Sequence, residues 1–81
     1  MDEMTIFEDE ARILRYLLEM DPVPRVQIDI ATATDISRRT CSKILERLLD
    51  IGLIRLHGRK GYGLTRLGGA HAKRLPDLPR P

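Results

Sequence analysis

Apolar residues recur every three or four positions between residues 6 and 20, which is the period of a helix with one buried face. The stripe consists of Phe7, Ala11, Leu14 and Leu18, with Ile13, Leu17 and Met20 beside it. Thr5 and Glu8 have the spacing of a capping box at the start of such a helix. The prolines of the segment DPVP, residues 21–24, end it, because proline lacks an amide donor and disfavours a helical residue before it.

The next segment, residues 25–33, is predicted to be a short second helix. Val26, Ile30 and Ala33 would share one face of it, with Ile28 nearby. The β-branched residues here also permit a strand. Residues 34–36 interrupt the apolar pattern, so a turn is expected before the next helix.

The clearest helical pattern covers residues 37–51. Its buried stripe is Cys41, Ile44, Leu45 and Leu48. The Ser37 hydroxyl can cap the first turn, and Gly52 can end the helix because glycine adopts positive φ without strain. A period of 3.6 residues then turns outward Arg38, Arg39, Ser42, Lys43 and Glu46, with Arg47 at one side.

Two short strands, residues 53–57 and 62–65, flank the turn GRKG at residues 58–61 and predict a hairpin. A bare hairpin is barely stable, so we expect it to pack on the helices through Leu53, Ile54, Leu56 and Leu64. Thr65 can cap a last helix ending near residue 75, although Gly68 and Gly69 weaken it. The predicted fold is therefore mainly α with a small β-hairpin (α+β), as one domain over residues 1–75 followed by a proline-rich tail, 76–81.

Composition narrows the possible functions. The chain of 81 residues has room for one small domain but little for a ligand cavity, so a small-molecule effector is not expected. The single cysteine and two distant histidines offer no metal-ligand spacing, and we expect no metal or cofactor. The sequence contains no nucleophile elbow, Gly-rich phosphate loop or His-Glu motif, so an enzyme is not expected. The acidic start and the lack of a long apolar run argue against targeting and membrane segments, so a cytoplasmic protein is expected.

Charge is divided unevenly along the chain. Residues 1–37 carry three arginines against nine acidic residues, a net −6, whereas residues 38–81 carry eleven basic against three acidic residues, a net +8. A basic side suits a polyanion, most often nucleic acid. The alternative is that the two halves simply attract each other within one fold.

Three motifs in this order resemble the winged helix-turn-helix of prokaryotic transcription regulators such as the MarR, ArsR and PadR families: IATATDIS, LLDIGLI and YGLTRLG. The resemblance implies that Ala31 lets two helices approach closely, and that Cys41 and Ile44 point inward from the recognition helix. Asp35 stands where the family usually has glycine, a mild departure because aspartate tolerates a left-handed backbone.

The resemblance implies duplex DNA as the partner, with the helix 37–51 in the major groove and the wing 58–61 on the backbone or minor groove. We expect Arg38 or Arg39 to read bases, Lys43 and Arg47 to bind phosphate, and Arg59 and Lys60 to act from the wing. The full set of candidate residues is Ser37, Arg38, Arg39, Thr40, Ser42, Lys43, Arg47, Arg59 and Lys60. The resemblance also implies a homodimer, formed through residues 6–20 and 66–75.

The sequence also permits other interpretations. The basic helix face could be merely solvated, the wing merely a polar turn, and His57 and His71 either ordinary surface residues or phosphate neighbours. Cys41 could be a redox switch, but its place in the buried stripe favours a core role. The chain could also be a winged-helix interaction module with little DNA affinity, or a nonspecific DNA-coating protein, against which the acidic first half argues.

Overall fold

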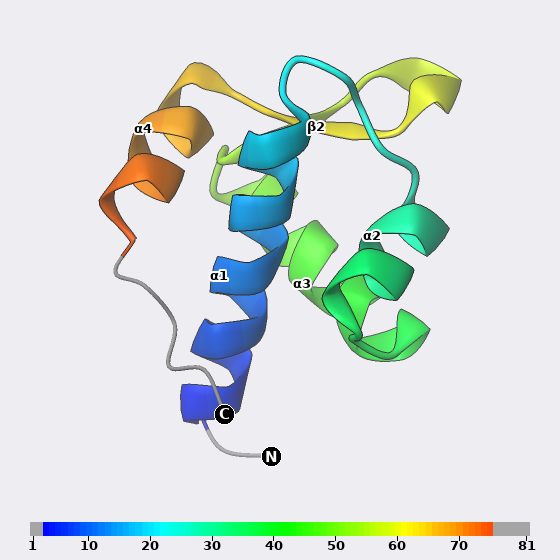
Figure 1. Cartoon of the computed structure of the whole chain (residues 1–81), viewed down its shortest axis with the longest axis vertical. Helices are drawn as coiled ribbons and strands as arrows, with labels where there is room; N and C mark the ends of the chain where they lie inside the picture. Colours follow the sequence, from blue (N-terminus) through cyan, green and yellow to red (C-terminus); the bar gives the residue numbers. More distant parts are fainter. Residues whose placement is uncertain (1–2, 76–81) are drawn as a thin grey trace.

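The computed structural model describes residues 3–75, with side chains from residue 8 onward. Along the chain the elements are α1 (Glu3–Met20), α2 (Gln27–Thr34), α3 (Arg38–Asp50), β1 (Ile54–Leu56), a 3₁₀ turn η1 (Gly58–Lys60), β2 (Tyr62–Leu64) and α4 (Arg66–Arg74). Figure 1 shows α1 between α4 on one side and α2 on the other, with α3 behind it and the hairpin across one end. The predicted fold class is confirmed. The proposed tail 76–81 lies outside the described residues.

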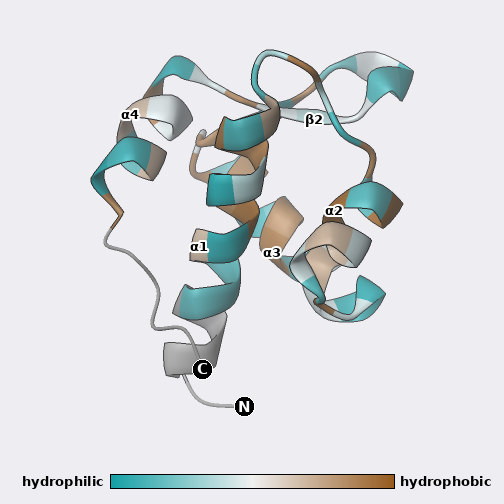
Figure 2. Ribbon diagram, viewed as in Figure 1, coloured by the Kyte–Doolittle hydropathy of each residue, from teal (hydrophilic) through white to brown (hydrophobic). Residues whose placement is uncertain are grey.

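The core forms where α1, α2 and α3 meet. Its most deeply buried side chains, each less than 2 % exposed or close to it, are Ile13, Leu14, Leu17, Ile30, Cys41, Leu45 and Leu48. Figure 2 shows hydrophilic residues on the outward surface of α1 and hydrophobic residues on α3 behind it. Burial of this apolar surface is the main force that holds the three helices together.

The start and the buried face of α1 differ from the sequence prediction. The helix begins at Glu3, so Thr5 lies inside it and the predicted capping box is wrong. The predicted centre of the stripe is also displaced, because Ile13 and Leu17 are fully buried while Leu18 is only partly buried. Helix α1 packs on α2 and α3 on one side and on α4 on the other, which buries a wider arc than one stripe.

The second segment is a helix, as predicted, but it presents a different face to the core. Ile30, Ala31 and Thr34 are buried. Thr34 can occupy this position because its hydroxyl donates a 2.6 Å hydrogen bond to the Ile30 carbonyl, which satisfies its polar group. The residues predicted to face inward that are instead exposed are Val26, Ile28 and Ala33.

The turn between α2 and α3 agrees with the prediction made from Asp35. This residue has φ 56° and ψ 40°, the left-handed conformation, at the end of α2. The Ile36 amide then donates to the Ala31 carbonyl over 3.1 Å, closing the end of the helix. At the other end of α3, Gly52 has φ 81°, as expected for a residue that terminates a helix.

The hairpin is antiparallel, with Ile54 opposite Leu64 and Leu56 opposite Tyr62. The sequence did not predict that a third segment pairs with β2. The Arg25 amide donates to the Tyr62 carbonyl at 2.9 Å, and the Tyr62 amide donates to the Arg25 carbonyl at 2.7 Å. This bridge connects the α1–α2 loop to the hairpin. The prediction that Leu56 packs on the helices is wrong, because it is 54 % exposed.

Helix α4 starts as predicted, with the Thr65 hydroxyl accepting a 3.0 Å hydrogen bond from the Gly68 amide. The same hydroxyl donates to the Gly52 carbonyl over 2.6 Å and so joins α4 to the end of α3. Gly68 is buried, and a Cβ atom there would overlap the Leu53 carbonyl. This glycine therefore permits a close approach of α4 to the start of β1.

Candidate nucleic-acid interface

The first turn of α3 is held by a side-chain cap. The Ser37 hydroxyl accepts a hydrogen bond from the Thr40 amide at 3.2 Å and donates one to the Thr40 hydroxyl at 3.0 Å. Ser37 and Thr40, two of the predicted site residues, thus cap the N-terminus of α3 in this structure. Arg38 and Arg39, which lie between them, are exposed. The cap fixes the backbone from which these two arginines project.

A contact from α2 supports the same turn. The side-chain amide of Gln27, at the start of α2, donates a 3.2 Å hydrogen bond to the carbonyl oxygen of Arg38. Sequence reasoning missed Gln27, since nothing in its local pattern indicates a partner eleven residues away. The contact fixes α2 and α3 relative to each other at the point where the exposed arginines begin.

The exposed face of α3 is basic in its first half and acidic in its second. Arg39 and Lys43 are exposed and lie opposite the buried stripe, as predicted. Glu46 and Asp50 continue this face toward the end of the helix and are exposed too. Positive charge is therefore concentrated at the N-terminal half, the part of a recognition helix that usually meets base edges.

Arg47 lies at the side of this face and is not isolated. Its Nε atom is 3.2 Å from the Glu10 Oε2 atom of α1, where the Glu10 side chain is only 12 % exposed and that of Arg47 is 57 % exposed. The structure therefore separates Arg47 from the other predicted cations, for which no ion pair is seen within residues 3–75. Sequence reasoning did not identify Glu10.

The wing carries Arg59 and Lys60 in the 3₁₀ turn, both exposed. The turn is closed by two backbone hydrogen bonds, from the His57 amide to the Gly61 carbonyl at 2.8 Å and from the Lys60 amide to the His57 carbonyl at 3.0 Å. A Cβ on Gly63 would lie 2.9 Å from Nε2 of His57, so this histidine packs against the wing backbone.

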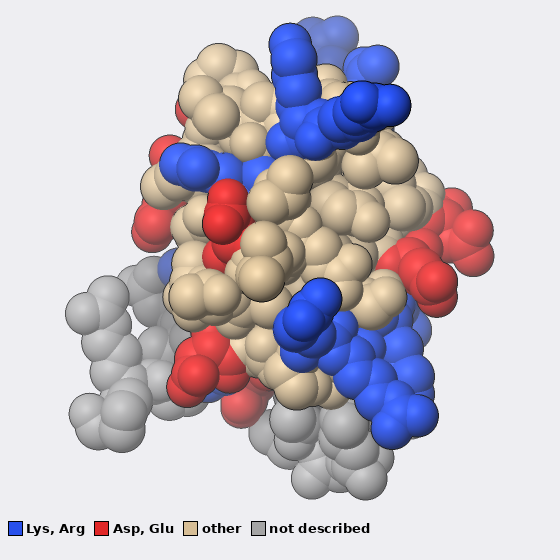
Figure 3. Space-filling model, turned by 90° about the vertical axis from the view of Figure 1, so that its right-hand side faces the viewer, with Lys and Arg blue, Asp and Glu red and all other residues tan. Residues whose placement is uncertain are grey.

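The two basic segments face the same side of the molecule. Figure 3 shows one group of Lys and Arg side chains over the wing and another over the start of α3, with mostly uncharged surface between them and acidic residues to either side. The described chain also exposes Arg55 on β1 and Arg66 at the start of α4, which sequence reasoning did not single out. Such a face presents two separated sets of donors to a polyanion.

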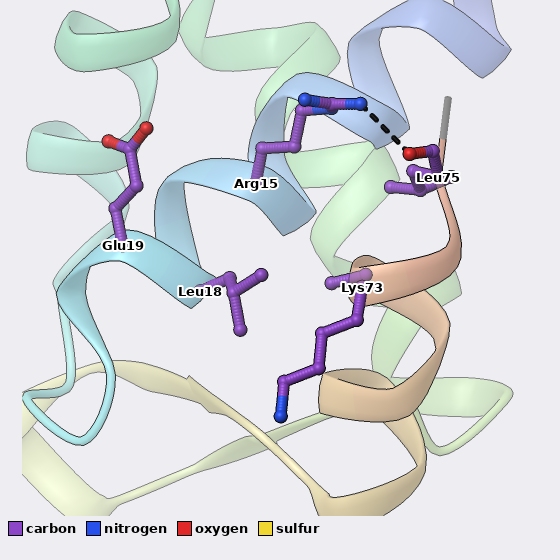
Figure 4. Close-up of a pocket in the computed structure, with 6 residues that line it drawn as sticks. Arg15, Leu18, Glu19, Lys73 and Leu75 are labelled. Atoms are coloured by element: carbon purple, nitrogen blue, oxygen red, sulfur yellow. Dashed lines mark hydrogen bonds between the residues drawn. The ribbon is translucent and has the colours of Figure 1, made fainter. Parts of the chain in front are cut away.

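A pocket of about 360 Å³ lies between α1 and α4 (Figure 4). Helix α4 lies on the other side of α1 from α2 (Figure 1). The lining residues of the pocket are Arg15, Leu18, Glu19, Ala72, Lys73 and Leu75. Arg15 points toward the end of α4 and donates a 3.0 Å hydrogen bond to the Leu75 carbonyl. Through this hydrogen bond Arg15 joins the end of α4 to α1.

Cys41 is a free cysteine with no solvent exposure. Burial disfavours the charged thiolate and raises the pKa of the Cys41 thiol above its ordinary value of 9.0. This environment favours the core role over a redox switch. Within residues 3–75 there is no group of three or more side chains suited to a metal ion, and no helix long and apolar enough to cross a membrane.

Comparison with known proteins agrees with this geometry. The winged helix-turn-helix DNA-binding family matches residues 10–55, more than half of the chain. A solved structure with a TM-score of 0.61 and 28 % sequence identity is an O-methyltransferase, NcsB1, from neocarzinostatin biosynthesis, in complex with S-adenosyl-L-homocysteine. The match covers 84 % of this chain but only 23 % of that one. No curated protein matches the sequence significantly.

Proposed function

The chain belongs to the winged helix-turn-helix DNA-binding family, and on that basis we propose that it is a sequence-specific duplex-DNA-binding protein that regulates transcription. In this proposal α3 enters the major groove and the wing lies on the backbone or in the minor groove. Its type would be that of the MarR, ArsR and PadR regulators, which the three sequence motifs resemble.

One observation carries the proposal: the cations at the start of α3 and those of the wing are exposed on the same side of the molecule (Figure 3). An arginine at the start of a recognition helix can bond guanine through two hydrogen bonds, worth about 1–3 kcal/mol of discrimination. The Ser37 cap and the Gln27 contact hold the backbone of Arg38 in place. Arg38 or Arg39 would therefore read bases, while Lys43, Arg59 and Lys60 would bind phosphate.

We propose that the protein binds DNA as a homodimer. Two copies would place their α3 helices in successive major grooves about 34 Å apart on a palindromic site. The exposed sides of residues 6–20 and 66–75 are the proposed contact surface, and Leu67 on α4 is 60 % exposed there. On this proposal the protein is a cytoplasmic binding protein and not an enzyme, with no cofactor or small-molecule effector.

The test is fluorescence anisotropy of a labelled random-sequence duplex, titrated at several salt concentrations. We expect binding that weakens with salt, with a slope of log K against log salt of about −0.9 per phosphate contact. Arg38→Ala/Arg39→Ala should weaken binding. Arg59→Ala/Lys60→Ala should weaken it and also flatten the slope by up to about 1.8, since two contacts are removed.

A matched control is Lys73→Ala/Arg74→Ala, which removes two adjacent exposed cations from α4, on the far side of α1 from α2. It lowers the net charge equally and should change the slope much less than the wing variant. Because residues 66–75 belong to the proposed dimer contact, the oligomeric state of this variant is compared with that of the wild type by analytical ultracentrifugation, and the slopes are compared only if the two agree. Absence of binding at low salt, or equal effects of all three double variants, would contradict the proposal. Success would justify selection of the preferred site from a random library.

A second candidate function is a winged-helix module that binds a protein partner within a larger assembly. The similarity to 23 % of the O-methyltransferase chain favours it, because there a region of this fold forms part of a larger protein. In this alternative the cations of α3 would be incidental. Failure of the duplex titration would favour it.

A further inference from the structure

The ion pair between α1 and α3 involves one particular edge of the Arg47 guanidinium. The contact to Glu10 Oε2 is made by Nε, at 3.2 Å. A guanidinium carries one N–H on Nε and four on its two terminal nitrogens. A carboxylate that occupies the Nε edge leaves the two terminal nitrogens free to bond a phosphate end-on through parallel hydrogen bonds.

The location of Arg47 suits such a contact. It follows Lys43 by four residues on α3, so the two side chains are neighbours on successive turns. Lys43 lies on the exposed basic face, and the Arg47 side chain is itself 57 % exposed. Arg47 therefore lies at the border between that face and α1.

Glu10 is well placed to orient this arginine. Its side chain is 12 % exposed, so packing in α1 restricts the carboxylate, whereas a free arginine side chain samples many rotamers. Ordering such a side chain opposes binding, and a side chain already held in position avoids part of that cost. We propose that Glu10 is a positioning residue, which holds the Arg47 guanidinium for a DNA phosphate beside the Lys43 contact. The inference rests on the proposed DNA-binding function.

Glu10 could also have the opposite effect on DNA affinity and lower it. A carboxylate also neutralises the arginine and could reduce its attraction to phosphate. Replacing Glu10 by methionine or glutamine separates the two effects, since both side chains are unbranched, have about the length of glutamate and remove its charge. The present contact is an ion pair at 3.2 Å in which Oε2 accepts no hydrogen bond, and only glutamine keeps an oxygen able to accept one from Nε at this distance.

The experiment measures duplex affinity and its salt slope for Glu10→Met, Glu10→Gln, Arg47→Ala and Glu10→Met/Arg47→Ala. We expect Arg47→Ala to weaken binding about tenfold, the loss of one charge-assisted hydrogen-bonded contact. Glu10→Met should weaken it about three- to tenfold, and Glu10→Gln should stay within about twofold of the wild type. In the Arg47→Ala background, Glu10→Met should have no further effect, because the positioned group is gone.

Asp9→Asn is the matched control. Asp9 has a side chain that is also 12 % exposed, but its 3.5 Å ion pair is to Arg12 of the same helix. This variant removes the same charge one residue away and should leave affinity within about twofold of the wild type. Circular dichroism and the Tm of each variant show that it is folded at the assay temperature.

Tighter binding by both Glu10→Met and Glu10→Gln would overturn the proposal and identify Glu10 as a competitor of phosphate. An Arg47→Ala variant that binds like the wild type would also overturn it. If the wild type binds duplex and Arg38→Ala/Arg39→Ala weakens it, such a result removes only the role of Glu10. If the wild type does not bind duplex, the proposed function and this inference fail together.

Discussion

Two adjacent glycines of α4 should respond in opposite directions to the same substitution. Alanine is favoured over glycine by about 1 kcal/mol in a helix interior. At Gly69 a Cβ atom would meet nothing within 4 Å, so Gly69→Ala should stabilise the protein by about this amount. At Gly68 the new Cβ would overlap the carbonyl of Leu53. Because the obstacle is backbone, α4 or the start of β1 must move.

The cost at Gly68 has two parts. Overpacking of a filled site costs about 1–3 kcal/mol. The Leu53 carbonyl also accepts a 3.1 Å hydrogen bond from the Thr65 amide, whose loss adds about 1 kcal/mol. After the gain in helix propensity of about 1 kcal/mol is subtracted, Gly68→Ala should be destabilising by about 1–3 kcal/mol. The two variants should therefore differ in free energy of unfolding by about 2–4 kcal/mol.

Thermal unfolding followed by circular dichroism measures this difference. For a domain of this size 1 kcal/mol shifts Tm by about 4–8 °C, so Gly68→Ala should melt at least about 8 °C below Gly69→Ala. Urea titrations provide the free energies at one temperature. Equal Tm values, or a Gly68→Ala variant more stable than the wild type, would refute the close approach of α4 to Leu53.

Three further predictions concern stability. Because φ is 56° at Asp35, Asp35→Gly should leave stability unchanged or raise it by up to about 1 kcal/mol, and Asp35→Val should lower it by about 1–2 kcal/mol. Urea titration measures both variants and would show the reverse order of stability if the turn were not left-handed. Thr65→Ala should cost about 1–2 kcal/mol by loss of its bonds to Gly68 and Gly52, whereas Thr65→Ser should recover most of it in the same titration. Burial raises the pKa of the Cys41 thiol in the folded state, so the contribution of the neutral thiol to the free energy of unfolding is fully present below pH 9.0. This contribution is lost as the pH rises through the higher pKa of the folded state. Stability should thus fall less above pH 9.0 in Cys41→Ala than in the wild type, and an equal fall would contradict the assignment.

Local signals explain which parts of the fold were predictable from the sequence. The Ser37 cap, the stripe of α3 and the positive φ of Gly52 each depend on residues within one or two helical turns, and the structure confirms all three. In α2 the apolar pattern alone does not determine which face is buried, because Thr34 becomes suitable for burial only through a hydrogen bond within the folded helix.

Features that depend on distant partners were not predictable. The Arg25 bridge to Tyr62 and the close approach of Gly68 to Leu53 arise where the backbone of one element meets another. In the sequence, Gly68 indicated only a weaker helix. The candidate site shows the same limit. Its cations on α3 were found by helical period and those of the wing by the turn between two strands, whereas the supporting contacts from Gln27 and Glu10 cross between helices.

The uneven charge of the chain had two interpretations, and the structure separates them residue by residue. Attraction between the halves is real at one point, where Glu10 of the acidic half pairs with Arg47 of the basic half. Arg38, Arg39, Arg59 and Lys60 are exposed, and within the described residues no ion pair is seen for any of them. Intramolecular compensation therefore leaves most of the basic face available. A partner that gains from this face must be an anion long enough to reach from the start of α3 to the wing, which a DNA duplex satisfies.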